Sequence, residues 1–141
     1  MKILSDDHAR FIELQLAELC GLPYPSVRLE VTVSCGDFAG ANPKVWVAAK
    51  DLQRFLAAFR EIERSRKGEA LLESMSPGIL ELRIEPTDSV GHFQLRFTLG
   101  RDEVSAWATH SQRLIGSFDL DAGCLGQFVG ELQAFFSALE E

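Results

Sequence analysis

The chain has 141 residues, of which 46% are hydrophobic and 25% are charged. This balance is typical of a folded soluble protein and excludes a disordered one, and the length suits a single domain over residues 1–141. The formal net charge of −7 would repel a phosphate backbone, so we expect no direct nucleic-acid ligand. A basic protein partner is compatible with that charge.

No segment has the roughly 18 consecutive apolar residues that a membrane-spanning helix needs, and the opening MKILSDDHARF lacks an apolar run of signal-peptide length. We therefore expect a cytoplasmic protein without a membrane contact. Cys20, Cys35 and Cys124 are far apart and form no C-x-x-C pair, so the sequence predicts neither a disulfide framework nor a zinc site. No other metal site and no cofactor is indicated.

Alternating apolar residues predict strands in the first third of the chain. The inward-facing positions are Ile12, Leu14 and Leu16, then Val27, Leu29, Val31 and Val33, then Val45 and Val47. Before the last pair, the segment CGDFAGANPK at residues 35–44 is rich in turn-forming residues and predicts a loop.

A helix is predicted over about residues 49–66. The apolar residues that recur there at helical spacing, as one stripe, are Leu52, Phe55, Leu56, Phe59 and Ile62. We expect Gly68 to end this helix and a short strand to precede Pro77.

Two further strands follow. Their inward-facing residues are Leu80, Leu82 and Ile84, then Phe93, Leu95, Phe97 and Leu99. The intervening segment EPTDSVGH predicts a hairpin loop and hence antiparallel pairing. If VSAWATH at residues 104–110 is a strand with Val104, Ala106 and Ala108 inward, then Trp107 points outward.

The end of the chain reads like a looser copy of the segment around the first helix, at an offset of 73 residues. Val45 and Val47 correspond to Phe118 and Leu120. The stripe of a second helix, over about residues 122–139, is Leu125, Phe128, Val129, Leu132 and Phe135. The chain thus contains a hairpin-and-helix unit twice, at about residues 27–66 and 91–139, by duplication or by convergence on one geometry.

Strands that are apolar on one face and joined by short loops pair antiparallel and need a covering layer. Two helices with one apolar stripe each can supply that layer. The sequence therefore predicts an α+β protein, a two-layer sandwich in which an antiparallel sheet of about six to eight strands carries two helices on one face.

The predicted outer face of this sheet carries charges of both signs, which is typical of a solvated surface or of cross-strand ion pairs. Aromatic residues fall on the same face, and exposed aromatics among charges are typical of a protein-binding surface. Alternatively, loops or the N-terminal segment cover them. The candidate partner-binding residues are Phe38, Trp46, Glu30, Glu81, Glu85 and Trp107.

Evidence for catalysis is weak. Asp119 and Asp121 could converge on a metal ion or act as an acid and base pair, but Asp121 is also well placed to cap the second helix. The three histidines are far apart in the sequence, and no base accompanies Cys124. Nucleotide-binding and nucleophile motifs are missing from the sequence. We therefore predict no catalytic residue and no enzyme.

Six short motifs occur in a consistent order: DFAG at 37–40, VWV at 45–47, DLQRF at 51–55, GEALLE at 68–73, GHFQL at 91–95 and FDLDAGCLGQFVGEL at 118–132. In this order and spacing the chain resembles the WapI-type immunity proteins and related small bacterial proteins over about residues 27–135. The resemblance implies a non-enzymatic protein that binds and neutralises a cognate toxin, in some members one that attacks RNA. LRFTLG followed by RDEVSAWATH departs from the shorter link expected before the last strand.

Three functions follow as hypotheses. The first is an interaction protein, an immunity protein whose partner is a basic toxin domain. The second is a small-ligand binding module with a pocket near Cys124 and His92, or a non-catalytic protein of another kind. The third is an enzyme that uses Asp119 and Asp121 with a metal, which requires both carboxylates to point into one cleft.

Overall fold

The computed structural model describes residues 1–21, 23–121, 123 and 125–139. Within them the chain forms two antiparallel four-stranded sheets, each followed by a helix. The first sheet consists of β1 (Lys2–Leu4), β2 (Arg10–Cys20), β3 (Ser26–Cys35) and β4 (Phe38–Ala48), and α1 (Ala49–Ser65) follows it. The second sheet consists of β5 (Ala70–Glu73), β6 (Leu80–Pro86), β7 (Phe93–Val104) and β8 (Thr109–Asp119), and α2 (Leu125–Leu139) follows it.

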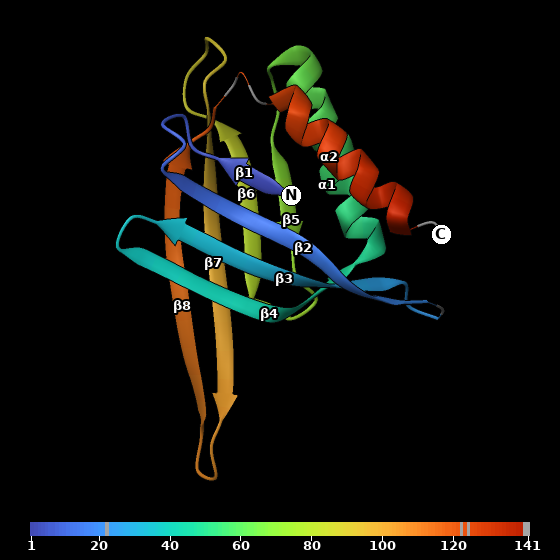
Figure 1. The fold of residues 1–141 in the computed structure, drawn as a ribbon, viewed down its shortest axis with the longest axis vertical. Coiled ribbons are helices and arrows are strands. Elements are labelled where there is room, and N and C mark those ends of the chain that lie inside the picture. Colours follow the sequence, from blue (N-terminus) through green and yellow to red (C-terminus); the bar gives the residue numbers. More distant parts are fainter. Residues whose placement is uncertain (22, 122, 124, 140–141) are drawn as a thin grey trace.

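The strand order in each sheet is the order along the chain, so hairpins join all neighbours. Figure 1 shows the strands of the two sheets crossing, with α1 and α2 side by side at one end. The inward faces of both sheets and one face of α1 form a single core. The contacts of β4 with β7 and β8 join the two sheets.

The predicted single sheet of six to eight strands with both helices on one face was wrong, although the α+β class and the antiparallel pairing are confirmed. Alternation identifies one buried face per strand, and either a helix or a second sheet can cover that face. Here α1 separates β4 from β5, so the two sets of hairpins form separate sheets. The helix itself contacts β5, β4 and α2.

The predicted helices and core residues are largely confirmed. All five stripe residues of the first helix are buried, and the inward residues of β3, β6 and β7 are buried as expected. The helix ends at Ser65, and Arg66, not Gly68, takes the left-handed conformation directly after it. In α2, Val129 packs against the core, while the side chains of the other four stripe residues lie outside the described part.

Two predicted segments differ from the structure. The loop expected at residues 35–44 is a two-residue turn at Gly36 and Asp37, because β4 already begins at Phe38. Residues 104–110 are not a separate strand: β7 ends at Val104, a four-residue turn follows, and β8 begins at Thr109. The side chains expected inward in this segment are exposed, because no second layer covers this end of the hairpin.

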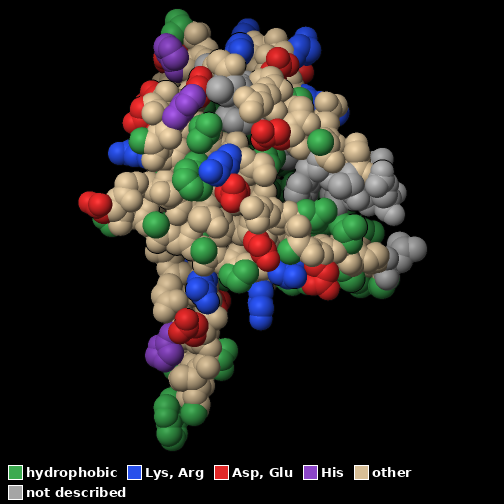
Figure 2. All heavy atoms as spheres, viewed as in Figure 1, with side chains coloured by type: hydrophobic (Ala, Val, Ile, Leu, Met, Phe, Trp, Pro, Cys, Tyr) green, Lys and Arg blue, Asp and Glu red, His purple; other side chains and the backbone are tan. Residues whose placement is uncertain are grey.

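The end of the β7–β8 hairpin, residues 101–113, projects from the body, and all of its residues are exposed. We call this segment the arm. Figure 2 shows it extending away from the rest of the molecule, with hydrophobic side chains at its tip. The arm contains the segment RDEVSAWATH, which makes the link before the last strand longer than expected.

Neither helix in the described part of the chain is long and apolar enough to cross a membrane.

Replacing Phe55 of α1 by alanine tests the core. Its ring is fully buried and packs edge to face on Phe59 with a centroid distance of 5.8 Å. We expect Phe55→Ala to lower the free energy of unfolding by about 3–5 kcal/mol in a urea titration, because a cavity replaces a buried ring. The exposed neighbour variant Arg60→Ala should stay within about 0.5 kcal/mol of the wild type. Equal effects of the two substitutions would contradict the described packing.

Candidate partner-binding site

The arm leaves the body where β4 crosses β7. Asn42 of β4 is only 8% exposed, and its Nδ2 donates a hydrogen bond of 2.7 Å to the carbonyl oxygen of Gly100 in β7. Its Oδ1 accepts a hydrogen bond of 2.9 Å from the backbone N–H of Lys44. Both ends of this buried amide are therefore paired, and the bond to Gly100 links one sheet to the other.

Close backbone packing fixes the base of the arm at Gly100, which we call the root. The Gly100 N–H donates to the carbonyl of Ile79 at 2.7 Å, and a Cβ at Gly100 would lie 2.5 Å from the carbonyl oxygen of Gly78. Real Cβ atoms do not approach an oxygen so closely, so any side chain at this position would push the β5–β6 link away from β7.

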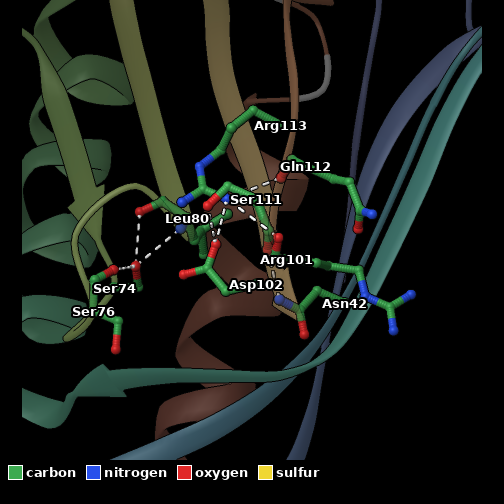
Figure 3. Close-up of polar contacts among 10 residues, drawn as sticks. Asn42, Ser74, Ser76, Leu80, Arg101, Asp102, Ser111, Gln112 and Arg113 are labelled. Atoms are coloured by element: carbon green, nitrogen blue, oxygen red, sulfur yellow. Dashed lines mark hydrogen bonds and ion pairs between the residues drawn. The ribbon is translucent and has the colours of Figure 1, made fainter. Parts of the chain in front are cut away.

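Arg113 of β8 ties β8 to β7 at the root of the arm. Its Nη1 donates to the Asp102 carboxylate at 3.0 Å and to the carbonyl oxygens of Arg101 and Gln112 at 3.3 and 2.9 Å. Figure 3 shows the Arg113 side chain turned back toward Asp102 and Ser111 between the two strands. Hydrogen bonds from Ser111 and Arg113 hold the pKa of Asp102 below its usual range, so the carboxylate stays charged near neutral pH.

A cleft lies on each side of this root. One, of about 430 Å³, lies along β4 and the β5–β6 link and is lined by residues that include Trp46, Ser74, Ile79 and Arg101. The other, of about 260 Å³, is lined by Ala39–Ala41 of β4 and by residues of β7 and β8. β4 thus crosses the root with Phe38 at its start and Trp46 near its end.

The tip of the arm is a turn held by Ser105. Its N–H donates to the Ala108 carbonyl at 2.8 Å, and its Oγ accepts hydrogen bonds from the N–H groups of Trp107 and Ala108 at 3.2 and 3.1 Å. The Trp107 side chain is 95% exposed and that of Val104 is 83% exposed. The tip therefore presents a large apolar side chain on an ordered backbone.

The structure places the predicted aromatic residues at three separate points, the two ends of β4 and the arm tip, and it also separates the predicted acidic ones. Phe38 is 70% exposed at the β3–β4 turn, Trp46 is half-buried in the larger cleft, and Trp107 is at the arm tip. The glutamates do not all share a face: Glu30 is on β3 of the first sheet, whereas Glu81 and Glu85 are together on β6 of the second.

The glutamates of β6 belong to ion pairs on the sheet surface, across to β7 for Glu85 and along β6 itself for Glu81. Glu85 accepts hydrogen bonds from Arg96 at 3.1 Å and from Gln94 at 2.8 Å, and these bonds lower its pKa. Glu81 lies 3.6 Å from a guanidinium nitrogen of Arg83. These two carboxylates are engaged within the sheet, in line with the ion-pair alternative that the sequence left open.

The carboxylates proposed for the enzyme hypothesis lie at the opposite end of β7. Asp119 and Asp121 line one hollow, of about 530 Å³, together with Asp6, Asp88 and His92. Asp121 lies just before α2, where its Oδ1 accepts a hydrogen bond from the Gly123 N–H at 3.0 Å and its Oδ2 contacts the His8 ring. Among the described residues, no group of three or more His, Cys, Asp or Glu side chains is arranged to hold a metal ion.

The cysteines add little to the site. Cys20 is exposed and Cys35 is half-buried, and both are free thiols; burial raises the pKa of Cys35. Cys124, which the ligand-pocket hypothesis placed beside His92, lies outside the described residues. Of that proposed pocket, the structure describes only the part around His92. This part belongs to the hollow that is lined by the four aspartates.

Sequence reasoning missed the residues that hold the arm. Asn42 lay in a segment interpreted as a loop, and Gly100 and Arg113 had no motif around them. One signal was available: a lone glycine after four alternating apolar residues marks a strand position where another backbone approaches closely.

Removing the Asn42 amide should destabilise the protein. Asn42→Ala leaves the Gly100 carbonyl without its side-chain donor, and we expect a loss of about 1–3 kcal/mol in a urea unfolding titration. Amide hydrogen exchange in the arm should also accelerate. The exposed variant Gln112→Ala, at the same level of the hairpin, should change stability by less than about 0.5 kcal/mol. An Asn42→Ala variant as stable as the wild type would show that this bond does not hold the sheets together.

The His92–Asp88 pair predicts a pH dependence. The Asp88 carboxylate raises the pKa of His92 by its hydrogen bond and charge, and His92 in turn lowers the pKa of Asp88. The histidine contribution to stability is fully present below about pH 6.5 and is lost as the pH rises through the higher pKa of the folded protein. The aspartate contribution is present above about pH 3.9 and is lost as the pH falls through the lowered pKa of Asp88.

An NMR titration checks this pair. We expect His92 to titrate above about pH 6.5 in the wild type and to return toward that value in Asp88→Asn. Equal titration midpoints in the two proteins would rule out the ion pair.

Comparison with known proteins adds one finding to this geometry. Neither the curated proteins nor the solved structures contain a match to the chain. A family model, however, matches residues 3–140, nearly the whole sequence, and so includes both sheets, both helices and the arm. The chain belongs to the immunity protein WapI-like family.

Proposed function

We propose that this protein is a non-enzymatic immunity protein that binds a cognate toxin and neutralises it through contacts at the arm. The observation that carries the proposal is the match to an immunity protein family over residues 3–140. An immunity protein acts by occupying a surface of another protein, so it needs an exposed and specific contact site more than it needs catalytic groups.

The arm has the properties of such a contact site. Tryptophan is among the residues that contribute most to binding when a partner buries them, and Trp107 is 95% exposed. The hydrogen bonds of Ser105 at the tip and of Asn42 at the root fix the arm before a partner arrives. This order reduces the conformational entropy that the arm loses on binding.

The two clefts extend this contact surface to the body. A partner that binds the arm would also meet Trp46 in the larger cleft and Phe38 at the start of β4. The acidic net charge favours a basic toxin domain, because complementary potentials accelerate encounter. In this proposal Glu30, Glu81 and Glu85 contribute to that long-range attraction, and the aromatic residues make the close contact.

Co-expression with a cognate toxin domain tests the proposal. We expect the wild type to restore growth and Trp107→Ala to lose protection, with a dissociation constant at least about 30-fold higher by titration calorimetry, as for a central interface tryptophan. Trp46→Ala should weaken binding to a smaller extent, because this side chain is already half-buried.

The control is Val90→Ala. Val90 is 75% exposed in the β6–β7 loop, at the other end of β7 from the arm. This variant should protect cells as the wild type does. Melting temperatures of all variants show whether each one is folded. Protection by Trp107→Ala equal to the wild type would refute the arm as the contact site, and a wild type that neither binds nor protects would refute the immunity role.

A further inference from the structure

The surface of this chain contains an apolar groove that the arm of the same molecule does not fill. The groove, of about 490 Å³, lies between the β2–β3 link, the start of α1 and the β5–β6 link. Its apolar lining consists of Pro23, Tyr24, Pro25, Ala48, Ala49 and Met75. Tyr24 is 78% exposed and Met75 is 53% exposed, so the groove opens onto solvent.

The groove and the arm tip have compatible chemistry. Proline rings, a tyrosine ring and a methionine thioether are favourable neighbours for an indole, because flat apolar surfaces stack and sulfur packs well against aromatic rings. Trp107 is the largest exposed apolar side chain of the described residues, and the ordered turn at Ser105 presents it. One chain therefore has both a projecting apolar group and a site of matching character.

The charges around the two elements also match. Lys50 lines the groove, and Ala48, the residue before α1, provides no side-chain cap, which leaves the positive end of the helix dipole toward the rim. Asp51 in the first turn of α1 offsets part of this charge and lies 3.5 Å from Arg54. The arm contributes Glu103, next to Val104, as a carboxylate for that rim.

Trp107 cannot reach the groove of its own molecule without a rearrangement of the arm. The side chain is 95% exposed, and the bonds of Asn42 and Arg113 fix the direction in which the arm leaves the body. A second molecule can supply a groove that Trp107 is able to enter. If each arm enters the other molecule's groove, the two contacts are equivalent and the assembly closes as a two-fold symmetric dimer.

We propose that two copies of this chain form such an arm-exchanged dimer, with Trp107 of each copy in the Pro23–Tyr24–Met75 groove of the other. The dimer does not depend on the proposed immunity role and is measured without a toxin. Because each copy has a net charge of −7, the two repel at long range, so self-association strengthens as salt rises. A complex with a basic partner weakens instead. The two contacts share Trp107 and therefore exclude each other on one arm.

Analytical ultracentrifugation of the purified full chain, over a range of protein and salt concentrations, tests the dimer. We expect the wild type to dimerise. Trp107→Ala, which lacks the projecting group, and Met75→Lys, which blocks the groove, should each raise the dimer dissociation constant at least ten-fold. Val90→Ala should dimerise like the wild type. All three side chains are exposed, and thermal melting confirms that each variant folds.

A mixture of the two defective variants gives the sharpest outcome. Trp107→Ala retains an intact groove and Met75→Lys retains an intact arm, so the mixture keeps one contact and should form a heterodimer more tightly than either variant forms its own dimer. A monomeric wild type at all concentrations would overturn the proposal. So would a dimer that survives either substitution, since another surface would then hold it together, or a mixture that stays monomeric.

Discussion

The contact between β4 and β7 at Gly100 is the constraint on which the rest of the molecule depends. The missing side chain at this position lets the β5–β6 link approach β7, and the Asn42 amide bonds the same residue from the other sheet. Three segments far apart in the sequence therefore meet at one backbone position. This contact sets where the sheets cross and where β7 leaves the core, and so it also sets the direction of the arm.

The order of elements explains why two sheets form. Each half of the chain contains four strands joined by hairpins and then a helix, and the helix between β4 and β5 prevents these strands from pairing as hairpin neighbours. Each sheet would leave its apolar face in water if it were alone. Packing the two faces together, with α1 at one end, buries both in one core. The 73-residue offset seen in the sequence reflects this arrangement, in which both halves of the chain have the same order of four strands and a helix.

Much of the fold could be predicted because its signal is local. In a strand the side chains alternate between faces, so Val27 to Val33 and Phe93 to Leu99 identify their own buried positions. The number of sheets could not be predicted, because the element that covers a strand's apolar face is set by contacts between residues far apart in the sequence. The same limit applied at residues 104–110, where alternation continues although no layer covers the hairpin.

The aromatic residues of the candidate site are proposed from the sequence, and the structure adds where each of them lies. The sequence pattern marks Phe38, Trp46 and Trp107 as unusual on an outer face, but where β4 lies relative to the arm depends on β4 crossing β7 at Asn42 and Gly100. Glu81 and Glu85 are candidate partner contacts from the sequence, and the ion partner of each, Arg83 for Glu81 and Arg96 for Glu85, is seen only in the structure. The register places Glu85 opposite Gln94 and beside Arg96, and these neighbours engage its carboxylate.

An exposed arm has a cost that its sequence partly offsets. A two-stranded ribbon is marginally stable on its own, and its free edges invite unwanted pairing with other chains. Charged residues reduce that risk along the strands, and Asp102 and Arg113 in addition tie the two strands together at the root. Large apolar side chains are confined to the region of the tip, at Val104 and Trp107. This distribution discourages association along the ribbon and leaves one end available, which is the arrangement expected of an element that binds a single matching site rather than any exposed strand.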